Sequence, residues 1–174
     1  MVARKSITIR KERFYPHPPE DVWAAISDAH ALAEWLEPNN HKPIVGHKFE
    51  FRCDPGSCGA GITSCEVLEA DPPRRLVWSW VHHPKPPAPP CEPMRIAWTL
   101  KPTDGGTLLI LEHTGAEHLT WLTRNMMRMG WGYMMKRLIP RILGRVEQGH
   151  FTPGAIPLSK RCYSCKSVPE EFVR

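Results

Sequence analysis

The sequence has no apolar stretch long enough to cross a membrane. Its 174 residues contain no run that approaches the roughly 18 apolar residues of a membrane-spanning helix. Residues 1–10 include basic side chains but no apolar core of the kind a secretory signal needs, so no signal peptide is indicated. We therefore expect a cytoplasmic protein with no membrane partner.

Familiar catalytic and phosphate-binding motifs are also missing. The chain has no Gly-x-Ser-x-Gly elbow, no phosphate-binding loop and no His-Glu-x-x-His pair. Six cysteines are too few for a disulfide framework in a chain of this size, so reduced thiols are the expected state. No cofactor and no metal are expected, and the sequence leaves open whether any reaction is catalysed.

The sequence has no large excess of positive or negative charge. The net charge of +5 is small and spread along the chain, which gives only a weak preference for anionic partners. Cations are densest on the predicted last helix, and aromatic residues do not interleave with them on that helix face as a stacking platform for bases would require. We expect a solvated helix face and no nucleic-acid partner. These cations are Arg124, Arg128, Lys136, Arg137, Arg141 and Arg145.

Proline and tryptophan are abundant instead. The 19 prolines predict stiff loops and sharply ended elements, and the 7 tryptophans supply large apolar bodies whose N–H groups need partners. Between 82 and 93, six prolines in twelve residues exclude a helix or an inner strand and predict a stiff, extended loop.

The spacing of apolar residues predicts an α+β fold. Helical spacing predicts a short helix after Pro18, a second after Asp28, and a long helix over 120–148 that Pro140 should kink. Alternation predicts strands over 6–15, 45–52, 62–68, 76–81, 94–100 and 107–113. Short turns between consecutive strands make them antiparallel. We predict a curved six-stranded antiparallel sheet, two short helices, and one long C-terminal helix on the concave side that encloses a cavity. Residues 1–149 would form this domain and 150–174 a C-terminal tail extension.

This order of elements resembles the helix-grip superfamily, also called START-like, SRPBCC or Bet v 1-like. Within it, an ordered set of local motifs resembles the family related to the C-terminal domain of the activator of Hsp90 ATPase. The motifs lie at 18–26, 32–36, 45–49, 65–80, 106–115 and 130–132. The resemblance covers about residues 6–147 and implies the fold and a pocket for a small molecule, because members bind or transform varied small molecules. The stiff loop at 82–93 and the tail after Gly149 depart from the family pattern.

The predicted inner faces carry many aromatic side chains. Ligand sites are mostly apolar with a few polar groups, and buried indole N–H groups without partners are unfavourable, so this set predicts a roomy interior. The competing interpretation is that the same side chains simply fill the core. The predicted ligand-binding residues are Trp35, Phe49, Phe51, Trp78, Trp80, Trp98, His113, Met127, Trp131 and Met135.

Three functions remain open from the sequence. The leading prediction is binding of a small apolar or aromatic molecule between the sheet and the C-terminal helix. The second is a small cyclase-type or hydrolase-type enzyme that uses the same cavity with His113 as acid or base. The third, implied by the resemblance, is a co-chaperone-like protein that binds a heat-shock ATPase. The apolar outer side of the last strand, at Leu108 and Ile110, suggests contact with the tail or with a second copy in a homodimer.

Two pairs of cysteines are spaced like halves of a zinc site. Cys53 and Cys58 are separated by four residues in a glycine-rich turn, and Cys162 and Cys165 are separated by two in the tail. Four thiolates can hold zinc in a tetrahedron, but only if the two pairs meet in space. Sequence does not decide between zinc, disulfides and ordinary thiols, and ordinary thiols are the expected state.

Overall fold

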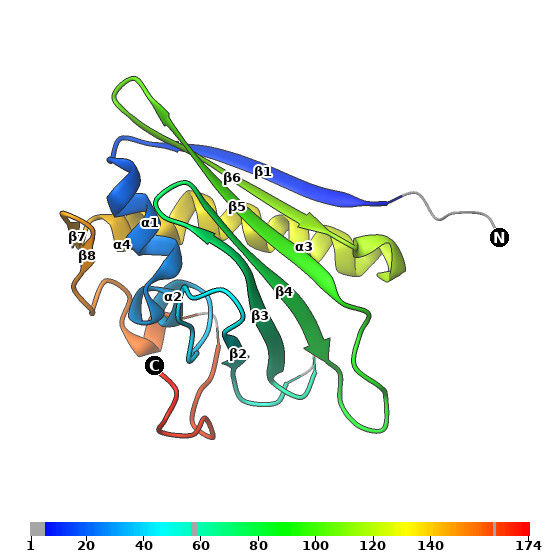
Figure 1. Ribbon diagram of the computed structural model, residues 1–174. Helices are drawn as coiled ribbons and strands as arrows, with labels where there is room; N and C mark the ends of the chain where they lie inside the picture. The colour runs from blue at the N-terminus through cyan, green and yellow to red at the C-terminus, as the bar shows by residue number, and fades with distance from the viewer. Residues whose placement is uncertain (1–5, 57–58, 162) are drawn as a thin grey trace.

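Figure 1 shows the computed structural model of the chain, which describes residues 6–56, 59–161 and 163–174. One antiparallel sheet has the strand order β1-β6-β5-β4-β3-β2. Its strands are β1 (Thr8–Tyr15), β2 (Lys48–Arg52), β3 (Ile62–Asp71), β4 (Arg75–His83), β5 (Met94–Thr103) and β6 (Gly106–Thr114). The predicted order of elements is confirmed, as is the α+β helix-grip fold.

The first two helices join β1 to β2. Helix α1 (Pro19–Ser27) begins at a proline, whose missing N–H is not needed in a first turn. Asp28 then ends α1 and caps α2 (Ala29–Trp35), because its carboxylate accepts a hydrogen bond of 2.9 Å from the backbone N–H of Ala31. These helices cover one end of the sheet's inner face.

The C-terminal helix consists of three segments. Thr120 caps α3 (Trp121–Tyr133), a π-helical turn follows at Met134–Leu138, and α4 (Ile139–Leu143) completes the helix. The π-helical turn ends two residues before Pro140, which has no N–H to continue the regular bonding pattern. Figure 1 shows the helix running along one face of the sheet.

Two boundaries differ from the sequence-based expectations. The long helix ends at Leu143 rather than at 148, because the chain turns at Gly144 into a two-stranded ribbon of β7 (Val146–Glu147) and β8 (His150–Phe151). Strand β2 begins at Lys48 rather than at 45, because Gly46 has a φ of 82° and forms a turn. None of the helices in the described part of the chain could span a membrane.

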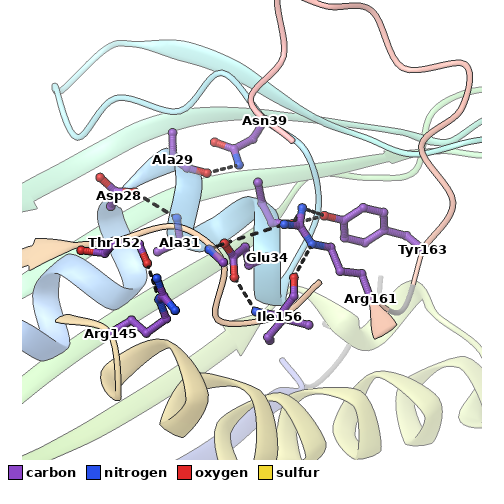
Figure 2. Close-up of polar contacts among 12 residues, drawn as sticks. Asp28, Ala29, Ala31, Glu34, Asn39, Arg145, Thr152, Ile156, Arg161 and Tyr163 are labelled. Atoms are coloured by element: carbon purple, nitrogen blue, oxygen red, sulfur yellow. Dashed lines mark hydrogen bonds and ion pairs between the residues drawn. The ribbon is translucent and has the colours of Figure 1, made fainter. Parts of the chain in front are cut away.

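The tail after Gly149 packs back on the domain, as Figure 2 shows. The buried carboxylate of Glu34 in α2 accepts hydrogen bonds from the backbone N–H groups of Gly154 (2.5 Å) and Ile156 (2.6 Å). Arg161 lies 3.8 Å from the same carboxylate, and the Tyr163 hydroxyl donates to the carbonyl of Ala33. Further along, Asn39 and Val173 form an antiparallel bridge, while Ile156, Val168 and Phe172 are buried. The tail is therefore part of the folded unit.

Candidate ligand site

Aromatic rings fill the inner face of the sheet. The Trp98 ring meets the Trp35 ring edge-on, with ring centres 6.0 Å apart, and lies 6.3 Å from the Trp78 ring. Phe49 lies 5.8 Å from Trp78 and 5.4 Å from Phe51. All five rings are buried. Strands β2, β4 and β5 bring the other four together because each strand turns alternate side chains to the same face, and Trp35 is added from the end of α2.

The helix adds one ring to this face. Trp131 of α3 packs against Trp98 at 5.7 Å, Trp80 at 6.1 Å and His113 at 6.0 Å. His41, which the sequence analysis did not single out, contacts Phe49 at 4.7 Å. We call this connected set the aromatic cluster; it comprises Trp35, His41, Phe49, Phe51, Trp78, Trp80, Trp98, His113 and Trp131. Of the other two predicted residues, Met135 is buried and Met127 is half-buried at the edge of the core.

Two indole N–H groups of the cluster have partners. Trp35 donates to the backbone carbonyl of Ala25 at 2.8 Å, and Trp131 donates to Nδ1 of His113 at 3.1 Å. Since Nδ1 of His113 accepts, the neutral ring carries its proton on Nε2. The hydrogen bond thus assigns the tautomer.

Three other donors of the cluster have no partner among the described residues. They are the indole N–H groups of Trp78 and Trp98 and Nε2 of His113. Each unpaired buried donor costs about 1–3 kcal/mol, which a bound acceptor atom would recover. The cluster thus contains polar groups that side-chain packing alone does not satisfy.

The two histidines of the cluster are neutral at physiological pH. Burial, with a smaller contribution from the nearby His118, lowers the pKa of His113 to about 4. Burial also lowers the pKa of His41 to about 4, although its Nδ1 donates to the carbonyl of Ser27 at 2.9 Å. His113 is fully buried, so its ring is sealed from solvent.

A pocket of about 440 Å³ opens at one end of the cluster, beside Trp80. Strands β3 and β4 form one wall, and the tail forms the other at Tyr163 and Ser164. Trp80 joins this pocket to the cluster, since its ring also contacts Phe51 at 5.6 Å and His113 at 6.2 Å. We call this space the Trp80 pocket. Its described lining residues are Glu37, Cys53, Asp54, Pro55, Gly56, Gly59, Gly61, Ile62, Thr63, Trp80, His82, Tyr163 and Ser164.

Glu37 is a polar group of the Trp80 pocket that sequence reasoning missed. Burial raises the pKa of its carboxyl to about 7, so the group titrates near neutral pH. Burial likewise raises the pKa of the Tyr163 hydroxyl to about 12, which keeps it protonated. No spacing in the sequence could have predicted this pocket, because Glu37, Trp80 and Tyr163 are far apart along the chain.

The apolar surface lies elsewhere than expected. Ile110 was expected to be exposed on the outer side of β6, but it is buried between its strand neighbours Glu12 and Thr99. The exposed apolar residues concentrate on α3. They are Trp121, Leu122, Met126, Met129 and Tyr133.

The comparisons with known proteins agree with this fold. The family model described as Activator of Hsp90 ATPase homolog 1-like protein matches residues 16–142. Among solved structures, the Mesorhizobium loti protein MLL2253 is 31% identical, with a TM-score of 0.69 over 82% of this chain and 99% of that one. A Bacillus halodurans protein, BH1534, is 24% identical, with a TM-score of 0.62 over 77% of this chain and 95% of that one.

A third solved structure is the Aha1 dimer from Colwellia psychrerythraea. It is 17% identical, with a TM-score of 0.60 over 76% of this chain and 92% of that one, and at this identity the likeness shows the fold alone. A search of curated proteins gives no match. The family match and the Mesorhizobium structure both extend over most of the domain. The chain therefore belongs to the family of Activator of Hsp90 ATPase homolog 1-like proteins.

Proposed function

We propose that the chain binds a small aromatic or apolar molecule carrying one polar group, and that the molecule lies in the Trp80 pocket. The observation that carries the proposal is the position of Trp80, whose ring lines a pocket of about 440 Å³ and also packs into the aromatic cluster. Ligand pockets have volumes of about 300–1,000 Å³ and combine apolar walls with a few polar groups. This pocket combines both features.

Glu37 supplies the polar contact. A carboxyl group with a pKa of about 7 is poorly solvated, so a ligand that donates a hydrogen bond or carries a positive charge would satisfy it. The Trp80 ring offers a flat face for stacking. Hydroxylated or amino-substituted aromatic molecules therefore fit better than bare hydrocarbons or aromatic acids.

The aromatic cluster holds this wall in place. Rings in edge-to-face contact fix one another's orientation, so Trp80 is presented rigidly to the pocket. The ligand-binding set expected from the sequence is thus proposed to act in two ways. Trp80 would contact the ligand, and the other residues of the set would hold the Trp80 ring in position.

Three naphthalene-based compounds test the proposal: naphthalene, naphthol and naphthylamine. Titration calorimetry should detect naphthol and naphthylamine binding more tightly than naphthalene. Trp80→Leu should abolish binding of all three. Glu37→Gln should reduce the advantage of naphthol and naphthylamine over naphthalene, because an amide oxygen is a weaker hydrogen-bond acceptor than a carboxylate. Met129→Ala, on the exposed face of α3, is the matched control. Binding that is unchanged in both pocket variants would refute the proposal.

Protein binding through α3 is a second candidate function. The exposed apolar side chains of α3 lie beside Arg124 and Arg128, a combination that suits an acidic protein partner such as a heat-shock ATPase. The test is the ATPase rate of an Hsp90-type protein with and without this chain. Replacing Trp121 and Met129 together by alanine should remove any stimulation while Trp80→Leu leaves it unchanged. Stimulation that survives the double replacement would exclude α3 as the contact.

The other two expectations have weaker support. A His113 acid–base role would need a histidine that titrates near neutral pH and reaches a substrate, whereas burial lowers the His113 pKa to about 4. A homodimer remains a proposal by analogy with the Colwellia dimer, and light scattering would test it.

A further inference from the structure

A groove of about 510 Å³ lies between the first strand and the C-terminal helix. One wall is residues 7–10 at the start of β1, and the other is the first part of α3. Strand β1 is at the edge of the sheet, so no further strand of the described sheet covers this side of it. Figure 1 shows the start of β1 and the start of α3 at the same end of the molecule. We call this space the β1–α3 groove, and it shares no lining residue with the Trp80 pocket.

The side chains that α3 contributes to the groove lie at helical spacing. Trp121, Arg124, Asn125 and Arg128 follow one another at intervals that place them in one stripe along the helix. The side-chain amide of Asn125 donates to the backbone carbonyl of Trp121 at 2.9 Å, which holds it against the helix. The helix therefore presents one indole ring and two guanidinium groups to the groove.

The two arginines of this stripe have no acidic partner among the described residues. Side chains four positions apart on a helix are neighbours, with β-carbons about 5–6 Å apart, so the charges of Arg124 and Arg128 repel each other. Arg10 on the opposite wall differs, because its guanidinium lies 2.8 Å from Glu12 and 4.0 Å from Glu112. Uncompensated positive charge is thus concentrated on the helix side of the groove, where a bound anion would relieve the repulsion.

Apolar surface lies beside these charges. The Trp121 side chain is 72% exposed, so its ring offers a flat face on which another ring can stack. Ile7 and Ile9 add apolar surface from the strand side. The nearby Glu117 carboxylate accepts a hydrogen bond from the backbone N–H of Ile7 at 3.2 Å and does not line the groove. The groove therefore combines positive charge with apolar walls.

No metal site is placed at the two cysteine pairs noted in the sequence. Cys58 and Cys162 lie outside the described residues, so the structure does not test whether they meet Cys53 and Cys165. Within the described ranges, no three metal-binding side chains form a group. The β1–α3 groove rests on described residues alone.

We propose that the β1–α3 groove binds a flat aromatic molecule that carries a phosphate or carboxylate group. Arg124 and Arg128 would hold the anionic group through the paired N–H donors of their guanidinium groups, and the ring of the molecule would stack on Trp121. This ligand is opposite in charge to the one proposed for the Trp80 pocket, where a carboxyl group lines the wall. The two proposals are independent, and either can fail without the other.

The indole N–H resonance of Trp121 reports on this groove alone, and its loss in Trp121→Phe assigns it. We expect naphthyl phosphate and naphthoate each to shift it in a saturable titration, with an affinity that falls as sodium chloride is added. Naphthylamine should leave it in place. Inorganic phosphate should displace naphthyl phosphate only at much higher concentration, because it has no ring to stack. Displacement at equal concentration would show a plain anion site and overturn the proposal, as would the absence of a shift with both naphthyl anions.

Replacement of single arginines tests the assigned contacts. Arg124→Gln and Arg128→Gln should each weaken naphthyl phosphate binding by about tenfold, because each removes a charge-assisted hydrogen-bond donor. Arg141→Gln is the matched control, since Arg141 is exposed on α4 and does not line the groove. These side chains lie at the surface, so the variants should fold normally, and thermal unfolding checks that they do. Naphthyl phosphate affinity that is unchanged in both groove variants, or reduced equally by Arg141→Gln, would refute the site.

Discussion

The indole N–H of Trp131 donates a 3.1 Å hydrogen bond to Nδ1 of His113, and this bond joins the C-terminal helix to the last strand of the sheet. Both partners are buried, so the bond is formed away from water. It explains why a histidine in an apolar interior is tolerated, since Nδ1 of a neutral imidazole can accept a hydrogen bond and Nδ1 of an imidazolium cannot. The helix is thus held on the sheet by a specific polar contact as well as by ring packing.

We predict that Trp131→Phe destabilises the fold by about 1–3 kcal/mol, because it leaves Nδ1 of His113 unpaired in the interior. Urea unfolding at neutral pH measures the change. Trp121→Phe is the control, since Trp121 is 72% exposed at the start of the same helix and should change stability little. Equal effects from the two replacements would show that the Trp131–His113 bond contributes nothing.

Stability should fall as the solution is acidified below the ordinary histidine pKa of 6.5. His113 and His41 have folded-state pKa values of about 4, so between 6.5 and about 4 the unfolded chain binds more protons than the folded chain. Each histidine can contribute up to about 3 kcal/mol to this loss. The free energy of unfolding, measured at a series of pH values, should decrease with pH over this range. His113→Leu should reduce this dependence. A flat profile would contradict the burial of both rings.

Glu37 should give stability the opposite pH dependence from the two histidines. Its folded-state pKa is about 7 against an ordinary 4.5, so the folded chain binds more protons between those values and stability falls as pH rises through them. Glu37→Gln should therefore stabilise the protein at pH values above about 7, by about 1–3 kcal/mol, and change it little in acid. Thermal unfolding at two pH values measures the difference. Glu12→Gln, on the exposed surface of β1, is the control.

The packing of the tail on the domain should depend on Glu34. Replacing Glu34 by alanine leaves the N–H groups of Gly154 and Ile156 unpaired and Arg161 without its carboxylate. Loss of one partner of such a buried network costs about 3–5 kcal/mol. Limited proteolysis should then cut the tail after Gly149 much faster than in the wild type. Unchanged resistance to protease would mean that other contacts, such as the bridge between Asn39 and Val173, hold the tail.

Much of the fold could be predicted because it depends on local patterns. Phe49 and Phe51, like Trp78 and Trp80, lie two residues apart and share a strand face. This period-2 pattern identifies the strands and the face they bury. Asp28 was correctly expected to start α2, because capping involves residues only three positions apart. The end of the long helix was missed, since helical spacing at Val146 also suits a short strand once Gly144 has turned the chain.

The site was less predictable because it depends on packing between distant segments. Sequence left open whether the aromatic residues fill the core or wall a cavity, and it did not predict the pocket beside Trp80. Glu37 was missed for the same reason, since its partners across the pocket come from β4 and the tail. The role of Glu34 was likewise not predictable, because its carboxylate binds the backbone of the tail about 120 residues further along the chain.

Binding beside Trp80 is the central claim, and the ring N–H resonances of the tryptophans test it most directly. In a nitrogen-15-labelled protein titrated with naphthylamine, the account predicts that the Trp80 indole resonance shifts most and that the Trp121 resonance on α3 does not move. Assignment follows from the loss of one peak in Trp80→Phe. If the largest shift belongs to Trp121, or if no indole resonance shifts at saturating naphthylamine, the Trp80 pocket is not a ligand site.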